Sequence, residues 1–186
     1  MQKMSDFLKN LILDYERDLY GNIYTLELSD GEVIRFEIKK KNVPHLLGIG
    51  HLALRQLMGK YANEVYKMLK NGQITLDHVT SVPNHKEVYK KIANFHYISN
   101  ILHCGDAVKV VKRVGSLNSR YLLYIDHQPN EIVHLGLAQD SAGNWYPESL
   151  QILHRNVTAY IDGQIPVDIV KMTVSRQDSD QVDIYS

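Results

Sequence analysis

The sequence is poor in cysteine: Cys104 is the only one among its 186 residues. A single cysteine cannot close a disulfide within the chain, and it cannot build a cysteine-rich zinc site. We therefore expect a reducing setting and assign the protein to the cytoplasm. The sequence also has no apolar run close to the roughly 20 residues of a membrane span, and its first residues do not form the apolar core of a signal peptide.

An excess of charge of either sign is also missing. The chain has 21 basic and 21 acidic residues, so its formal net charge is zero. A neutral chain produces no overall field that attracts nucleic acid, so any anion site has to be a local patch. The contents of charged residues (23%) and hydrophobic residues (44%) are ordinary for a globular protein, and the length suits a single domain over residues 1–186.

What the sequence does contain is a strand pattern with one polar interruption, at residues 131–138. Its apolar positions Val133, Leu135 and Leu137 alternate and so fall on one face of a strand. His134 falls on the other face, beside the small residues Gly136 and Ala138. A histidine with only small neighbours on its face is a candidate functional residue, and the alternative is a structural histidine with satisfied partners.

The remaining pattern places helices first and strands later. Helical spacing or capping residues indicate helices from Ser5 to Gly21, over 52–69, where Gly59 could break the helix, and over 84–104. Asn42 could begin another helix with His45 in its first turn, and the alternative there is a loop. Alternation and turn residues indicate a hairpin over 24–38, then strands over 108–114, 120–126, 131–138 and 145–153, with 74–79 as a short strand or a linker. Pro147 suggests a sheet edge or a bulge.

This order predicts an α+β protein with helices packed on one face of a four- to five-stranded antiparallel sheet. The N-terminal helix and hairpin belong to the same domain, and residues from about 174 to 186 form a frayed polar tail. His96 and His103 lie seven residues apart, and no Cys, Asp or Glu completes a ligand set with them. We therefore expect neither a metal nor another cofactor.

Five short segments carry a resemblance to a known family. They are PHLLG (44–48), SRYLL (119–123), VHL (133–135), YPES (146–149) and YIDGQ (160–164). With this order of elements, residues 24–170 resemble the phage-associated branch of the barnase–EndoU–colicin–RelE (BECR) superfamily of nucleases. The resemblance implies a helical layer on a four-stranded antiparallel sheet, with RNA cleaved on the sheet face. The positions that match its motifs are His45, His134 and Ser149, while Gly136 stands where we expect a bulkier residue.

Metal-free RNA cleavage needs a base for the 2′-OH, an acid for the leaving 5′-oxygen, and stabilisation of the charged transition state. Histidine suits both proton-transfer roles, because its ordinary pKa is about 6.5. We therefore predict His45 and His134 as an acid–base pair. Ser149 would hold the phosphate or orient a histidine.

Substrate binding requires cations and an aromatic surface. Lys109 and Arg113 fall on one face of their predicted strand, and Arg120 lies on the next, so these three could form a local basic patch. Tyr146 could stack on an unpaired base. The alternatives are solvated sheet residues for the three cations and a packing role for the tyrosine.

Two functions remain open at this point. The first is a metal-independent endoribonuclease that uses histidine acid–base chemistry, acting as a toxin or as a phage or mobile-element effector. Its substrate would be RNA, and an antitoxin or a host protein would be a further partner. The second is a catalytically inactive binding module with the same fold, acting as a phage-borne inhibitor of a host system.

Overall fold

The computed structural model describes residues 6–113, 117–128, 131–154, 160–176 and 182–185. The predicted cap Ser5 lies outside these ranges. The contacts within the chain divide it into two compact units. The helical unit comprises Met1–Tyr20 and Lys39–His96, and the sheet unit comprises Gly21–Ile38 and Tyr97–Ser186.

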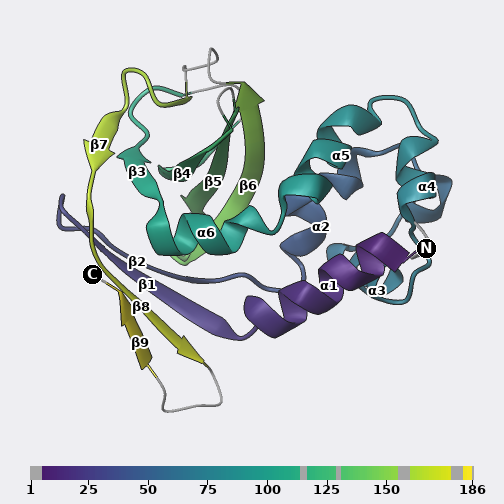
Figure 1. Ribbon diagram of the computed structural model, residues 1–186, viewed down its shortest axis with the longest axis horizontal. Helices are drawn as coiled ribbons and strands as arrows, with labels where there is room; N and C mark the ends of the chain where they lie inside the picture. Colours follow the sequence, from purple (N-terminus) through teal and green to yellow (C-terminus); the bar gives the residue numbers. More distant parts are fainter. Residues whose placement is uncertain (1–5, 114–116, 129–130, 155–159, 177–181, 186) are drawn as a thin grey trace. The chain divides into compact units, whose positions relative to one another are not determined.

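The helical unit contains short helices joined by tight turns (Figure 1). They are α1 (Phe7–Asp18), α2 (Val43–Leu46), the 3₁₀ turns η2 (Ile49–His51) and η3 (Arg55–Leu57), α3 (Ala62–Lys70), α4 (Leu76–Thr80) and α5 (His85–Asn94). The apolar spacing of α1 buries Leu8, Ile12 and Tyr15. Glu16 of α1 accepts hydrogen bonds from α3, at 2.8 Å from the Tyr66 hydroxyl and 2.7 Å from the Lys70 ammonium. These bonds hold α1 against α3.

Three helical predictions are corrected. The helix predicted over 52–69 begins only at Ala62, after the 3₁₀ turn η3. The segment predicted over 74–79 as strand or linker contains α4, because the Thr75 side chain accepts a hydrogen bond from the backbone N–H of His78 and caps a helix there. The helix predicted over 84–104 is two helices, α5 and α6 (Tyr97–Cys104).

The sheet unit contains two antiparallel sheets rather than one. The four-stranded sheet has the order β2-β1-β8-β9, with β1 (Asn22–Leu28), β2 (Val33–Glu37), β8 (Ile169–Arg176) and β9 (Val182–Tyr185). The predicted hairpin is present as β1 and β2, which bury Tyr24, Leu26, Ile34 and Phe36. The predicted frayed tail is wrong: it contains β9 and the end of β8. Strand β8 pairs with β1, which is distant in the sequence, and β9 pairs with β8.

The five-stranded sheet has the order β6-β5-β4-β3-β7. Its strands are β3 (Asp106–Lys109), β4 (Tyr121–Gln128), β5 (Glu131–Gln139), β6 (Trp145–His154) and β7 (Ile165–Val167), and α6 packs against β4 and β5. The predicted meander of four consecutive antiparallel strands is confirmed as β3 to β6. The α+β class with antiparallel sheets is likewise confirmed. Strand β3 is shorter than predicted, and Arg113 lies beyond its end.

A bulge interrupts β6 at Pro147, as predicted. Gly136 on β5 lies opposite Ser149, whereas the next residue, Leu137, lies opposite Pro147. Glu148 is therefore an extra residue between the two pairs. Strand β6 is also at the edge of its sheet, where a proline that cannot donate a backbone hydrogen bond is tolerated.

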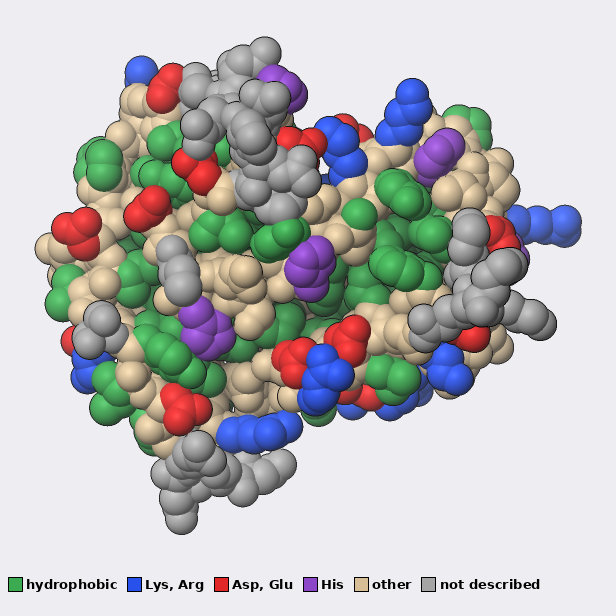
Figure 2. Space-filling model, viewed as in Figure 1, with side chains coloured by type: hydrophobic (Ala, Val, Ile, Leu, Met, Phe, Trp, Pro, Cys, Tyr) green, Lys and Arg blue, Asp and Glu red, His purple; other side chains and the backbone are tan. Residues whose placement is uncertain are grey.

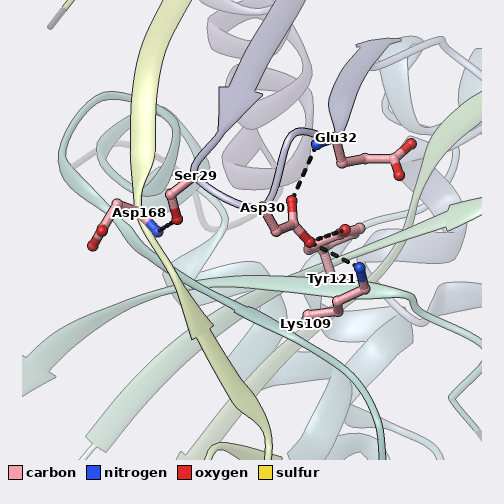
Figure 3. A network of polar contacts seen from close by, with 6 residues as sticks. All are labelled: Ser29, Asp30, Glu32, Lys109, Tyr121 and Asp168. Atoms are coloured by element: carbon pink, nitrogen blue, oxygen red, sulfur yellow. Dashed lines mark hydrogen bonds and ion pairs between the residues drawn. The ribbon is translucent and has the colours of Figure 1, made fainter.

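The turn between β1 and β2 is fastened to the five-stranded sheet (Figure 3). The Asp30 carboxylate accepts two hydrogen bonds of 2.8 Å, one from the Lys109 ammonium and one from the Tyr121 hydroxyl. The Ser29 hydroxyl accepts a hydrogen bond of 2.9 Å from the backbone N–H of Asp168. These contacts join the two sheets within the sheet unit.

Among the described helices, none has both the length and the apolar character that crossing a bilayer requires.

Candidate functional site

Three of the predicted site residues share one face of the five-stranded sheet. His134 on β5 lies opposite Tyr124 on β4, and Ser149 and Tyr146 on β6 lie opposite Gly136 and Ala138. Directly opposed residues of antiparallel strands point to the same face, and every second residue of a strand does too. His134, Ser149 and Tyr146 therefore lie on one face, which we call the histidine face. The apolar residues Val133, Leu135 and Leu137 form the opposite face.

His134 is buried between two tyrosines. Its side chain is 1% exposed, and its ring centroid lies 6.0 Å from that of Tyr124 and 5.7 Å from that of Tyr160. Within the described residues, neither ring nitrogen has a hydrogen-bond partner. Burial disfavours the charged imidazolium and lowers the pKa of His134 to about 4. At neutral pH the ring is therefore uncharged, and one nitrogen is available to accept a proton.

Gly136 leaves room for two hydroxyl groups on the histidine face. A Cβ built at this position would lie 2.6 Å from the Ser149 hydroxyl oxygen and still closer to that of Ser119. Any side chain larger than hydrogen would collide with both. This lack of space explains why a glycine stands at position 136, where we expected a bulkier residue. The Ser149 hydroxyl is buried and has no hydrogen-bond partner among the described residues.

Glu148 is a buried acidic residue that the sequence analysis missed. Its carboxylate accepts a hydrogen bond of 2.5 Å from the Ser119 hydroxyl and one of 2.9 Å from the backbone N–H of Asn118. Glu148 is itself the extra residue of the β6 bulge. The one signal that could have found it was Pro147, because a bulge redirects the side chain next to it. Glu148 therefore fixes the position of Ser119 above Gly136.

The predicted basic patch does not assemble around His134. Lys109 lies opposite Tyr121, and Tyr121 lies opposite Leu137, so Lys109 points to the face opposite the histidine face. Its ammonium is bound to Asp30, and this hydrogen bond raises the pKa of Lys109. Sequence reasoning could not see this contact, because Asp30 is distant in the chain.

The other two predicted cations lie outside the strands. The Arg120 guanidinium donates a hydrogen bond to the Gln139 side chain and lies over the Trp145 ring, 5.4 Å from its centroid. Arg113 is exposed and follows the end of β3. On the face shown in Figure 2, acidic and basic side chains are interspersed, in keeping with the neutral net charge.

His45 belongs to the helical unit. It is exposed on α2, with its ring centroid 6.1 Å from that of His51. His45 and His134 thus lie in different units, and their acid–base pairing stays a prediction of the sequence. In the described part of the chain, no three His, Cys, Asp or Glu side chains converge as metal ligands do.

The sheet unit thus combines antiparallel sheets with an uncharged histidine and a serine that both lack hydrogen-bond partners among the described residues. The comparisons with known families identify the class. A family model described as phage-Barnase-EndoU-ColicinE5/D-RelE like nuclease 4 matches residues 8–181, and the chain belongs to this family of BECR-superfamily nucleases. No curated protein and no solved structure matches the chain.

Proposed function

We propose that the protein is a metal-independent endoribonuclease whose reaction takes place on the histidine face. The observation that carries the proposal is that the uncharged imidazole of His134 and the hydroxyl of Ser149 lie on one sheet face, each buried and without a partner among the described residues. Buried polar groups without partners are rare and costly in proteins. A substrate that bonds to them would satisfy both.

The proposed reaction is an internal transfer of the phosphodiester. His134 accepts the proton of the 2′-OH, the 2′-oxygen attacks the phosphorus, and the bond from phosphorus to the 5′-oxygen breaks. An acid protonates the 5′-oxygen, which leaves as a hydroxyl, and the other product ends in a 2′,3′-cyclic phosphate. Ser149 donates its hydroxyl hydrogen to a non-bridging oxygen as charge develops there. The sequence prediction for the acid is His45.

The histidine role also sets the expected pH dependence. Because the pKa of His134 is lowered to about 4, the base stays deprotonated well below neutrality. The acidic limb of kcat/KM for the free enzyme should therefore lie near pH 4 rather than near the ordinary histidine pKa of about 6.5.

As its biological setting we propose the cytoplasm, where the protein would act as a toxin or as a phage or mobile-element effector. An antitoxin or a host protein would then be its protein partner. The burial of His134 supports a second candidate, a catalytically inactive binding module that inhibits a host system, because a histidine with 1% exposure needs a neighbour to move before RNA can reach it.

The test is cleavage of a labelled mixed-sequence RNA in EDTA by the parent, His134→Ala, His134→Gln and the control His103→Ala, an exposed histidine on α6. We expect the two His134 variants to lose about 10²–10⁴ in rate, with products bearing 2′,3′-cyclic phosphates and no cleavage of 2′-O-methyl RNA. Glutamine keeps more of the buried volume than alanine, and thermal melting identifies a variant that is merely unfolded.

Equal cleavage by the parent and a folded His134 variant contradicts the histidine role. A parent that cleaves no RNA favours the binding module.

A further inference from the structure

The row of three rings on the histidine face suggests how RNA meets His134. The imidazole lies between Tyr124 and Tyr160, with tilts of 44° and 35° between the ring planes. The imidazole itself is 1% exposed, whereas both tyrosines are only half-buried. Two half-exposed aromatic rings thus flank the buried imidazole.

The two tyrosines differ in their place in the fold. Tyr124 lies within β4, in register between Asp106 of β3 and His134 of β5. Tyr160 lies outside the strands, in a short turn that leads to β7. The backbone of a turn can shift together with its ring, whereas a backbone shift at Tyr124 would break the hydrogen bonds of the strand ladder.

The segment that carries Tyr160 is anchored at its other end by a buried glutamine. The Gln164 side chain accepts a hydrogen bond of 2.8 Å from the backbone N–H of Val111 and donates one of 2.9 Å to the carbonyl of Lys112. Lys112 is exposed, and its ammonium lies 3.0 Å from where a Cβ of Gly163 would be. The turn supplies an aromatic ring, Tyr160, and the Lys112 ammonium lies beside Gly163, three residues further along that turn. A ring and a cation are the two groups that bind a base and its phosphate in single-stranded RNA.

We propose that Tyr160 is the base-stacking residue of this nuclease: an unpaired base next to the cleaved phosphodiester stacks on its ring, and the ring turns from His134 to admit the ribose. Lys112 contacts a phosphate of the same nucleotide. This inference rests on the proposed ribonuclease function and assigns it a substrate, RNA with an unpaired base. It assigns the stacking role to Tyr160 rather than to Tyr146, whose register partner Ala138 is four residues from His134.

Binding is measured with a 2′-O-methyl RNA oligonucleotide, which the proposed chemistry cannot cleave. Fluorescence anisotropy compares the parent with Tyr160→Ala, Tyr160→Leu, Tyr160→Phe and Tyr185→Ala. Tyr185 is a matched control, because it is a half-exposed tyrosine that also packs against a histidine. Its ring centroid lies 4.8 Å from that of His103. Leucine keeps an apolar cover over His134 without an aromatic face, so it separates stacking from packing.

We expect Tyr160→Ala and Tyr160→Leu to raise Kd on the order of 10- to 100-fold, and Tyr160→Phe and Tyr185→Ala to change it by less than about threefold. An abasic nucleotide at the stacked position should weaken the parent but add little to Tyr160→Ala, as expected when two changes remove one contact. Modification of His134 by diethyl pyrocarbonate, followed by mass spectrometry, should be faster in Tyr160→Ala than in the parent.

The outcomes separate the two proposals. If the parent cleaves RNA through His134 while Tyr160→Ala and Tyr160→Leu bind like the parent, the stacking role is wrong and the ribonuclease stands. If the parent binds the oligonucleotide through Tyr160 but cleaves no RNA, the stacking role stands and the catalytic function is wrong. If the parent binds no RNA at all, both are overturned.

Discussion

At the scale of single residues, the important property of His134 is that it is buried without a partner. A histidine in contact with water or with a carboxylate changes charge near neutral pH, whereas this one stays neutral to about pH 4. The sequence showed that His134 would share a face with Gly136 and Ala138, because strand alternation is local. It could not show that Tyr124 and Tyr160 would enclose the ring, because those contacts depend on distant parts of the chain.

This burial predicts a pH dependence of stability. Between pH 6.5 and about 4 the unfolded chain takes up a proton at His134 that the folded state excludes, so the folded state loses stability as the pH falls through this window. Above pH 6.5 the penalty is absent. The loss should reach about 3 kcal/mol near pH 4. Urea unfolding of the parent and His134→Gln at several pH values measures it, because glutamine does not titrate and the difference between the two isolates this one group.

The expected result is that the parent loses more stability than His134→Gln on acidification, with the two curves parallel above pH 6.5. Parallel curves over the whole range from pH 7 to 4 would mean that His134 is hydrated or bonded in solution.

At the scale of elements, the contact between β5 and β6 decides the shape of the site. Pro147 indicated the bulge in advance, and the bulge adds Glu148, which holds Ser119 over Gly136. The meander of β3 to β6 could be predicted because its turns and alternation are local. The pairing of β8 with β1 could not, because it joins residues about 150 apart in the chain, and nothing in the polar composition of residues 174–185 marks them as strand.

The close approach at Gly136 predicts a specific cost for adding one methyl group. Gly136→Ala would place a Cβ against the hydroxyls of Ser119 and Ser149, and overpacking of this kind costs about 1–3 kcal/mol of unfolding free energy. Gly50→Ala is the control, because a Cβ there meets nothing within 4 Å. Denaturant unfolding of both variants measures the difference.

A rescue experiment shows whether the collision is the cause. Removing both hydroxyls in Ser119→Ala/Ser149→Ala should recover part of the stability lost in Gly136→Ala, since contacting residues do not behave additively. If Gly136→Ala is as stable as the parent, the two hydroxyls do not lie over this glycine.

At the scale of the whole molecule, the family match covers both units, since residues 8–181 run from α1 to beyond β8. The fold class and the family could be inferred from the sequence, because the order of elements and five short motifs identify them. The partners of the predicted basic residues could not be inferred from the sequence, because they come from distant parts of the chain. Lys109 is bound to Asp30 and Arg120 to Gln139, so these two cations are already engaged within the protein.

A neutral chain with engaged cations should bind RNA with a weak dependence on salt. Each phosphate neutralised on single-stranded nucleic acid contributes about −0.7 to the slope of log K against log salt concentration, so one to three contacts predict a slope of about −1 to −2. Lys112→Gln should reduce the slope by about 0.7. Lys171→Gln should leave the slope unchanged, because Lys171 is paired with Glu27 at an N–O distance of 3.1 Å.

Anisotropy titrations of 2′-O-methyl RNA from low to moderate salt measure the slope for the parent and for both variants. A parent slope steeper than about −4 would require a phosphate-binding surface of about six or more cations. Binding would then be governed by such a surface, and the stacked base would no longer account for the affinity.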